Sequence, residues 1–401
     1  MQLKQSKTDA IMDISLIEFM EVQLKNTTSA FHRYMYEQVS WESRMFGLVG
    51  PRGVGKSTMV LQYIKEQRDS RRMLYVSADH LYFASHTLVE TVDEFSKEGG
   101  EQIFIDEIHK YANWSRELKQ IYDSYPDMKI GFTGSSVLDI YKGFSDLSRR
   151  APIFSMQGLS FREYLHLAHG IKSAAYRLDD ILSLKFSLEG VSHPLPLFRD
   201  YLQRGYYPFG AESDFGIKLR QVINQTMEVD IPQYANMNAS TGRKLKKLLA
   251  VIAQSVPFKP VMDTIATIIG VSRNVLPDYF LYIEQAGMIG QLRDDTGGIR
   301  GVGKVEKVYL DNTSMAYLLG GAATDIGNVR ETFFYNQTRV AYDVISSRIS
   351  DFEINGKTFE VGGKKKSKKQ LSTAKEGYVV RDDIEYGSGN IIPLWAFGLL
   401  Y

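Results

Sequence analysis

The chain has 401 residues, of which 44% are hydrophobic, 24% charged and 12% aromatic. This is the composition of an ordinary globular protein, and the length allows about two to four compact units. Lys and Arg total 48 and Asp and Glu total 47, so the net charge of +1 excludes a polybasic nucleic-acid coat but allows a local basic patch. The absence of cysteine excludes disulfides, thiolate metal sites and a cysteine nucleophile.

The N-terminal part of the chain mixes Lys, Asp and Glu with short apolar runs and has no apolar core of a signal peptide. No stretch reaches the roughly 18 apolar residues that a membrane-spanning helix needs. We therefore expect a soluble cytoplasmic protein with no membrane partner.

Short apolar runs alternate with helical patterns in the first third of the chain. The residue pattern predicts helices over residues 31–44 and 57–67, the second with apolar residues at helical spacing. The predicted strands cover residues 45–50, 73–77, 102–105 and 128–132. This alternation is typical of a parallel sheet wrapped by helices, so the predicted fold class is α/β.

The first predicted strand runs into a glycine-rich turn that fits the pattern G-x-x-x-x-G-K-[ST]. Glycines let such a loop curl so that successive backbone N–H groups point at phosphate oxygens. We expect Lys56 to neutralise β- and γ-phosphate charge and the Ser57 hydroxyl to bind magnesium, at the positive end of the helix that opens there. The expected nucleotide-binding residues are Gly50, Pro51, Arg52, Gly53, Val54, Gly55, Lys56, Ser57 and Thr58. A purely structural glycine turn is the alternative.

The apolar strand over residues 103–105 ends in Asp106 and Glu107. An aspartate at this position can hold magnesium through its water shell, and the following glutamate can orient and deprotonate the attacking water. Such a pair is often only an exposed strand edge, but its spacing from the phosphate-binding loop favours catalysis. The pattern therefore predicts ATP and Mg²⁺ as ligands and hydrolysis as the reaction.

Hydroxyls and arginines follow the last of these strands. Thr133 and Ser135 lie in the run Thr133-Gly134-Ser135-Ser136, where a hydroxyl could report on the γ-phosphate or merely cap the next helix. Arg149 and Arg150 carry guanidinium groups suited to a γ-phosphate of the same chain or of a neighbour, although arginine pairs are also common on surfaces.

The second part of the chain is predicted to be mostly helical over residues 160–240, with breaks at 205–208 and 230–232. Three short helical patterns at 244–253, 261–269 and 275–286 precede a strand at 305–310, which is the order of a winged helix-turn-helix. Arg273 lies near the start of the segment 272–286 that would enter a DNA groove, but Asp278 and Glu284 weaken this interpretation. The tail has one helix and short strands.

Several runs of residues resemble bacterial and archaeal AAA-type P-loop ATPases that carry a C-terminal restriction-endonuclease-like domain of unknown function. The resemblance covers nearly the whole chain. The runs that carry it are residues 50–57, 105–109, Trp114, 133–136, 149–150, 159–165, 201–208 and 359–364.

The resemblance implies a division of the chain into four parts. These are a P-loop AAA-type ATPase domain (1–170), a helical lid or linker (171–240), a winged helix (241–320) and a restriction-endonuclease-like domain (321–401).

A nuclease of that fold needs an acidic residue followed by Glu-x-Lys. Here Glu331 is expected to begin a helix, Asp351 precedes a strand and Glu360 lies in the next, but Gly362 stands where the lysine belongs. The absence of this lysine favours a degraded or structural domain over an active nuclease. The run Lys364–Lys369 could contact phosphates or be a solvated face.

Three functional interpretations remain open. The first is a magnesium-dependent ATPase that remodels DNA or a protein partner, and that could form homo-oligomers. The second is a nucleotide-sensing switch with little turnover. The third is a nuclease gated by ATP.

Overall fold

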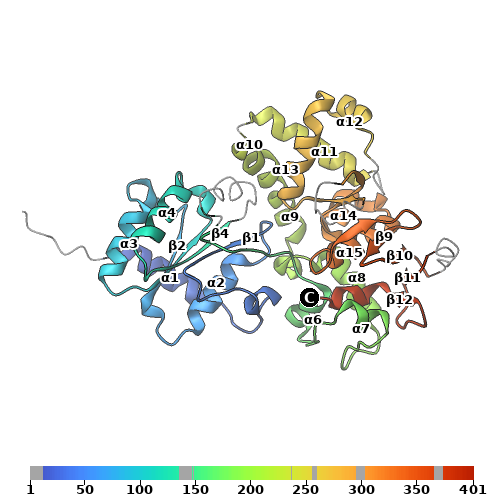
Figure 1. Ribbon diagram of the computed structural model, residues 1–401, viewed down its shortest axis with the longest axis horizontal. Coiled ribbons are helices and arrows are strands. Elements are labelled where there is room, and N and C mark those ends of the chain that lie inside the picture. The colour runs from blue at the N-terminus through green and yellow to red at the C-terminus, as the bar shows by residue number, and fades with distance from the viewer. Residues whose placement is uncertain are drawn as a thin grey trace, which may run out of the picture. The chain divides into compact units, whose positions relative to one another are not determined.

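The computed structural model describes residues 12–134, 147, 149–235, 237–254, 260–294, 303–364 and 374–401. The chain folds into two compact units (Figure 1). The first extends to Met156 without Arg52–Val54, and the second comprises Arg52–Val54 and Gln157–Tyr401. Each unit has its own sheet and helices.

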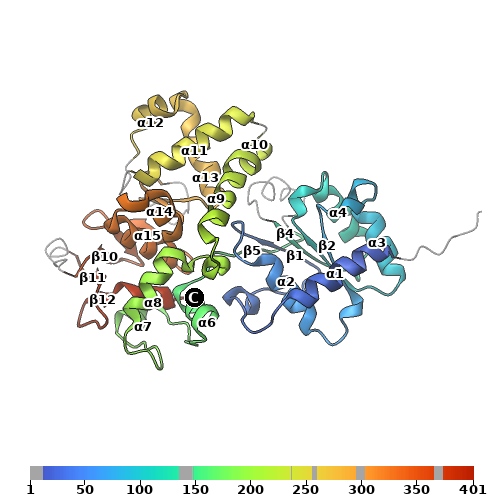
Figure 2. The same ribbon diagram turned by 180° about the vertical axis from the view of Figure 1, so that it is seen from behind.

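The first unit contains a five-stranded sheet in the order β2-β3-β4-β1-β5, with every neighbouring pair parallel. Its strands are β1 (Met45–Val49), β2 (Met73–Ser77), β3 (Gln102–Asp106), β4 (Lys129–Gly134) and β5 (Ile153–Ser155). Its helices are α1 (Ile14–Asn26), α2 (Lys56–Glu66), α3 (Leu88–Lys97) and α4 (Trp114–Ser124), which surround the sheet in Figure 2. The predicted α/β fold and its first four strands are confirmed.

Helices cover both faces of this sheet, which explains why its central strands are continuously buried. On one face, Ile105 and Phe132 share a core with Leu118 of α4 and Val92 of α3. On the other face, the Tyr63 ring of α2 lies edge-on to Phe104, with ring centroids 5.8 Å apart. Every second side chain of the central strands therefore points toward α2, the helix that follows the phosphate-binding loop.

The predicted helix over residues 31–44 is wrong. Only a short 3₁₀ turn, Tyr34–Glu37, forms there. Trp41 instead stacks flat on Tyr63 with centroids 4.2 Å apart, and its indole N–H donates to the carbonyl of Tyr36. Tertiary packing of aromatic rings thus outweighs the local helical pattern.

The second unit has a helical part and a mixed sheet. Its helices are α6 (Phe161–His169), α7 (Leu178–Leu182), α8 (Pro194–Asp200), α9 (Phe215–Gln225), α10 (Ile231–Tyr234), α11 (Ala239–Gln254), α12 (Met262–Ile269), α13 (Leu276–Gln285), α14 (Thr313–Gly320) and α15 (Ile326–Thr338). Its strands are the antiparallel hairpin β6 (Ile289–Arg293) and β7 (Val305–Leu310), and β8 (Val344–Ser346), β9 (Phe352–Ile354), β10 (Lys357–Gly362), β11 (Gly377–Arg381) and β12 (Ile391–Pro393). The sheet order is β12-β11-β10-β9-β8, antiparallel from β8 to β10 and parallel beyond.

Two details of this unit differ from the sequence prediction. Where a break was predicted, a π-helical turn, Thr226–Asp230, joins α9 to α10, and Pro232 falls in the first turn of α10. Glu331 lies within α15 rather than at its start. Helices α11–α13 and the hairpin follow in the predicted order, but the winged-helix and restriction-endonuclease-like assignments stay predictions.

The run at residues 159–165 has a structural role that sequence reasoning did not supply. Ser160 caps α6 by accepting a hydrogen bond from the Glu163 N–H, and Glu163 accepts one from the Ser160 N–H, both at 3.1 Å. The Ser160 hydroxyl also donates to the carbonyl of Tyr401 at 2.7 Å. The capping box fixes the start of α6, and the Ser160 hydroxyl ties it to Tyr401.

Candidate nucleotide-binding site

The glycine-rich loop connects the end of β1 to the start of α2. Gly50, Gly53 and Gly55 have φ values of 153°, 82° and 97°, a region that side chains disfavour. A Cβ on Gly50 would lie 2.1 Å from the carbonyl oxygen of Met156, so only glycine fits there. The Lys56 ammonium is buried and donates to the carbonyls of Gly50 and Pro51 at 2.9 and 2.8 Å, so it lies within the loop's curve.

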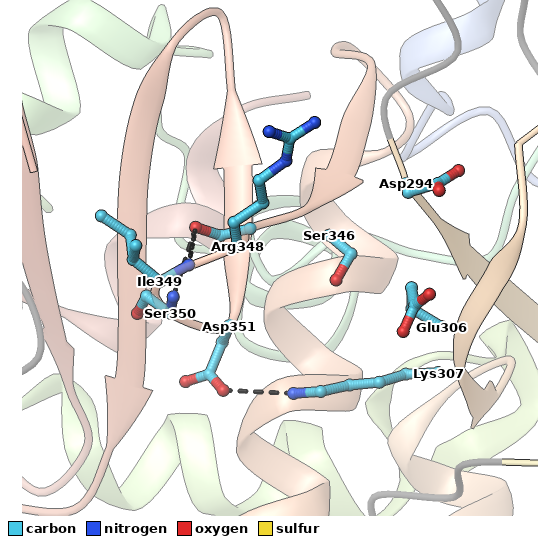
Figure 3. A pocket seen from close by; sticks show the side chains of 9 residues that line it. Asp294, Glu306, Lys307, Ser346, Arg348, Ile349, Ser350 and Asp351 are labelled. Carbon is cyan, nitrogen blue, oxygen red and sulfur yellow. Dashed lines mark hydrogen bonds and ion pairs between the residues drawn. The ribbon is translucent and has the colours of Figure 1, made fainter.

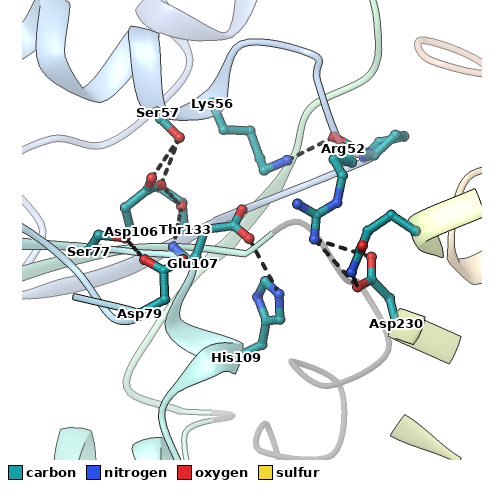
Figure 4. A network of polar contacts seen from close by, with 12 residues as sticks. Arg52, Lys56, Ser57, Ser77, Asp79, Asp106, Glu107, His109, Thr133 and Asp230 are labelled. Atoms are coloured by element: carbon teal, nitrogen blue, oxygen red, sulfur yellow. Dashed lines mark hydrogen bonds and ion pairs between the residues drawn. The ribbon is translucent and has the colours of Figure 1, made fainter. Parts of the chain in front are cut away.

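Asp106, at the end of β3, is the centre of a cluster of hydroxyl groups (Figure 4). The Ser57 hydroxyl lies 2.9 and 2.8 Å from its two carboxylate oxygens. The Tyr75 hydroxyl donates to Oδ2 at 2.8 Å, and the Thr133 hydroxyl donates to Oδ1. The carboxylate is only 7% exposed, so these donors compensate most of its lost hydration.

Strand register explains why these groups converge. Tyr75 pairs with Phe104, Phe104 pairs with Gly131, and Asp106 and Thr133 lie two residues beyond these partners on the same face. Because α2 covers that face, Ser57 in its first turn lies directly above Asp106. The fold therefore brings the two expected metal-binding groups into contact.

Glu107 has left-handed backbone angles, φ 52° and ψ 40°, which are unusual for a residue with a side chain. Its N–H donates to the Thr133 hydroxyl oxygen at 3.2 Å. Its carboxylate Oε2 lies 3.5 Å from Nε2 of the buried His109. Strained backbone of this kind costs about 1–3 kcal/mol and persists where surrounding contacts enforce it, which is typical of functional sites.

The groups at this edge of the sheet match the preferences of Mg²⁺. A serine hydroxyl and a carboxylate are hard oxygen ligands. The lysine ammonium at the same loop can neutralise part of the negative charge of a bound polyphosphate. Burial, together with the charge of Asp106, raises the pKa of Tyr75 far above its ordinary value, so its hydroxyl remains a hydrogen-bond donor. The residues present thus fit a magnesium–nucleotide complex.

Sequence reasoning missed Tyr75 and His109. Tyr75 could have been found if β2 had been known to lie beside β3, because it faces the same side of the sheet as Asp106. The sequence pattern does not reveal which strands are neighbours. His109 follows the acidic pair directly, and its spacing alone gave no sign that it would be buried against Glu107.

The structure brings Thr133 into the site but not the arginines. Arg150 lies 3.2 Å from Asp123 at the end of α4, and Arg149 is exposed. Both precede β5, so they lie at the edge where the parallel strands begin, while the loop with Lys56 follows the edge where β1 ends. A strand of five residues separates these edges by roughly 16 Å. Ser135 lies outside the described residues.

Glu331 and Asp351, two acidic residues expected in the nuclease-like site, pair with a lysine from another element. Lys307 of β7 lies 3.0 Å from Glu331 of α15. It also lies 3.1 Å from Asp351, and both of these line a pocket of about 550 Å³ (Figure 3). Burial would lower the pKa of Lys307, but the charges of Glu331 and Asp351 outweigh this and raise it. Glu360 of β10 is buried and accepts a hydrogen bond from Ser350.

Gly362 ends β10, and the cation beside Glu331 and Asp351 is Lys307 of β7. Of the run Lys364–Lys369, only Lys364 lies within the described residues. Among all residues that the structure describes, no group of three or more His, Asp or Glu side chains is arranged to hold a metal ion. The ion pairs of Lys307 with Glu331 and Asp351 make this cluster an ion-pair network.

Basic side chains in the helical part gather on α11 rather than on the predicted groove-entering segment. Arg273 pairs with Asp263 at 3.0 Å. Helix α11 contains Arg243, Lys244, Lys246 and Lys247 and no acidic residue. Lys246 pairs with Glu228 at 3.1 Å, and Arg243 and Lys247 are exposed one helical turn apart.

The geometry of the loop, the Ser57–Asp106 contact and the strand order are those of a P-loop domain. Residues 42–165 match an AAA domain. This match supports nucleotide binding and an ATPase-like function for the AAA-type domain. Residues 195–325 match a domain of unknown function.

One protein sequence and two solved structures are similar to parts of this chain. An uncharacterized protein of Methanocaldococcus jannaschii is 27% identical over 265 residues, 60% of this chain and 55% of that protein. The chain thus spans about half the length of this curated relative. A Walker-type ATPase of Pyrococcus abyssi is 14% identical, with a TM-score of 0.47 over 72% of this chain and 95% of that one. The Hsp104–ADP complex of S. cerevisiae is also 14% identical, with a TM-score of 0.28 over 67% and 37%.

Within the part of the chain that the structure describes, every helix is too short or too polar to cross a membrane.

Proposed function

We propose that the AAA-type domain binds ATP with Mg²⁺ and hydrolyses it. The contact of the Ser57 hydroxyl with both oxygens of Asp106, at 2.9 and 2.8 Å, carries this proposal. These two residues would hold the metal ion, which neutralises phosphate charge when bound. Lys56, at the same loop, would contact the β- and γ-phosphates.

Glu107 is the proposed general base. It directly follows Asp106 in the chain, and its carboxylate would take the proton from the attacking water. Its N–H is bound to the Thr133 hydroxyl, which also donates to Asp106. Thr133 would therefore couple the general base to the metal-binding carboxylate.

Nucleotide binding and phosphate release together test this proposal. Lys56→Ala should bind a fluorescent ATP analogue at least tenfold more weakly, because a buried charge that faces the phosphates is lost. Glu107→Gln should bind it like the parent protein and release little phosphate. Parent-like turnover in Glu107→Gln would exclude Glu107 as the base.

Arg149 and Arg150 would act on the nucleotide of a neighbouring copy. Their position at the opposite edge of their own sheet favours this over action within one chain. An Arg149→Ala/Arg150→Ala variant should bind ATP and not hydrolyse it. Mixing it with Glu107→Gln protein should restore part of the turnover, since each supplies what the other lacks; no recovery in a mixed oligomer would contradict action between copies.

DNA is the partner that the exposed cations favour, and we propose α11 as its contact. Exposed cations on one helix face, with no acidic residue in the helix, suit a phosphate backbone. Arg243→Gln/Lys247→Gln should weaken duplex binding and lower the slope of log affinity against log salt by about 2. Lys218→Gln serves as the control, because Lys218 is a cation outside α11 that is already paired with Glu212. An unchanged slope would exclude α11.

The C-terminal sheet is proposed as structural rather than as an ATP-gated nuclease. The ion pairs of Lys307 with Glu331 and Asp351 favour this, because the carboxylates already have a cation. Plasmid DNA incubated with protein, ATP and Mg²⁺ or Mn²⁺ should stay intact. Nicking that the Glu360→Gln variant abolishes would overturn this proposal.

A nucleotide-sensing switch is the second candidate function. The left-handed Glu107 and its hydrogen bond to Thr133 favour it, since a strained segment can hold two arrangements. Light scattering with ATP, ADP or no nucleotide would identify a switch by a change of mass or shape at negligible turnover. Steady turnover without such a change would favour the ATPase.

A further inference from the structure

We propose that Tyr75 is a positioning residue of the nucleotide site, whose hydroxyl fixes the orientation of the Asp106 carboxylate toward a magnesium–nucleotide complex. This inference rests on the proposed function and adds a residue from a strand that none of the phosphate-binding motifs includes. It follows from the contacts around Asp106.

The Tyr75 hydroxyl reaches Asp106 along the diagonal between two neighbouring strands. Tyr75 of β2 pairs with Phe104 of β3, and Asp106 lies two residues further along β3 on the same face. A tyrosine side chain is long enough to span such a diagonal, and its hydroxyl lies 2.8 Å from Oδ2. Serine or threonine at this position would be too short to make the contact.

The Tyr75 ring is held firmly in place. It is only 3% exposed, and Phe19 of α1 lies parallel to it with centroids 6.1 Å apart and planes at 12°. Helix α1 packs along β2, so the ring is enclosed between a strand and a helix. A hydroxyl on a fixed ring is a fixed donor, and a carboxylate bound to it has a preferred plane.

The hydrogen bonds of Asp106 divide into two kinds. Ser57 lies at nearly equal distances from both oxygens, so its single O–H does not favour one oxygen over the other, and its oxygen lone pairs can still bind a metal ion. Tyr75 at Oδ2 and Thr133 at Oδ1 remain, one donor for each oxygen. Together they would stop the carboxylate from rotating about its Cβ–Cγ bond.

Tyr75 is a cleaner probe of this role than Thr133. Thr133 also accepts a hydrogen bond from the Glu107 N–H, so changing it disturbs the proposed base as well. Tyr75→Phe removes one oxygen atom and leaves the ring packing intact. Loss of a residue that orients a metal ligand typically weakens metal affinity by about 10–100-fold.

The test is the magnesium dependence of nucleotide binding, measured with a fluorescent ATP analogue. Tyr75→Phe should bind the analogue without Mg²⁺ within about twofold of the parent. The Mg²⁺ concentration that gives half of the magnesium-dependent gain in binding should rise about tenfold. Tyr63→Phe is the matched control, because Tyr63 is also a buried residue of the first unit but its hydroxyl donates to Glu42 at 3.2 Å; it should behave like the parent.

The outcomes separate this inference from the proposed function. If the parent responds to Mg²⁺ and Tyr75→Phe responds at the same concentrations, the role of Tyr75 is refuted and the nucleotide site stands. If parent binding is indifferent to Mg²⁺ or to Lys56→Ala, the proposed function itself fails. Equal loss in Tyr75→Phe and Tyr63→Phe would indicate a general packing defect and would also overturn the inference.

Discussion

Replacing Lys307 by methionine should destabilise the second unit strongly. Lys307 lies 3.0 Å from Glu331 and 3.1 Å from Asp351, and the three side chains are 12%, 14% and 16% exposed. Removal of one partner from a buried ion pair costs about 3–5 kcal/mol, because the remaining charge stays buried without compensation. Two carboxylates remain here, and burial and Asp351 already raise the pKa of Glu331. Since all three side chains keep some contact with water, we expect about 3 kcal/mol.

Thermal and urea unfolding, followed by circular dichroism, would measure this loss. For a unit of this size, about 3 kcal/mol corresponds to a fall in Tm of roughly 9 °C. Lys304→Met is the matched control in the same hairpin region, since Lys304 pairs with Glu306 at 2.8 Å on the surface and its loss should cost less than about 1 kcal/mol. If both variants unfold alike, Lys307 is not the counter-ion of a buried cluster.

Two further variants test contacts at single hydroxyls. Ser160→Ala should lower the unfolding free energy of the second unit by about 2 kcal/mol, because it removes a helix cap and a buried hydrogen bond to the Tyr401 carbonyl; a loss below about 0.5 kcal/mol in urea unfolding would contradict this. Thr133→Val should reduce turnover roughly tenfold or more while nucleotide binding stays within about threefold, because the link between Asp106 and the Glu107 N–H is broken. Thr133→Ser should restore turnover, and parent-like turnover in Thr133→Val would exclude the link.

The local pattern was sufficient for the loop and for four of the five strands of the first unit's sheet. Apolar runs bounded by turns marked β1 to β4, and the glycine spacing marked the loop before Lys56. Strand β5, Ile153–Ser155, was missed because three residues are too few for a periodic signal. The run at 31–44 was misread because the stacking of Trp41 on Tyr63 is a contact between segments distant in the sequence.

Only those residues of the candidate site that belong to sequence motifs could be predicted. Asp106 was found because it ends an apolar strand, whereas Tyr75 needed the neighbour order of β2 and β3, which sequence spacing does not give. Lys307 shows the same limit in the second unit. In the sequence, Gly362 stands where a lysine was expected. The lysine that pairs with Glu331 is Lys307, which belongs to the β6–β7 hairpin.

Hydrolysis by Glu107→Gln is the measurement that tests the central claim most directly. In a phosphate-release assay with saturating ATP and Mg²⁺, this variant should lose at least about 100-fold in turnover, which is the lower range for loss of a general base. Its affinity for ATP should match the parent. Glu94→Gln, a carboxylate change on α3 of the same unit, should keep full turnover. Turnover in Glu107→Gln equal to that of Glu94→Gln would contradict the proposed catalytic site.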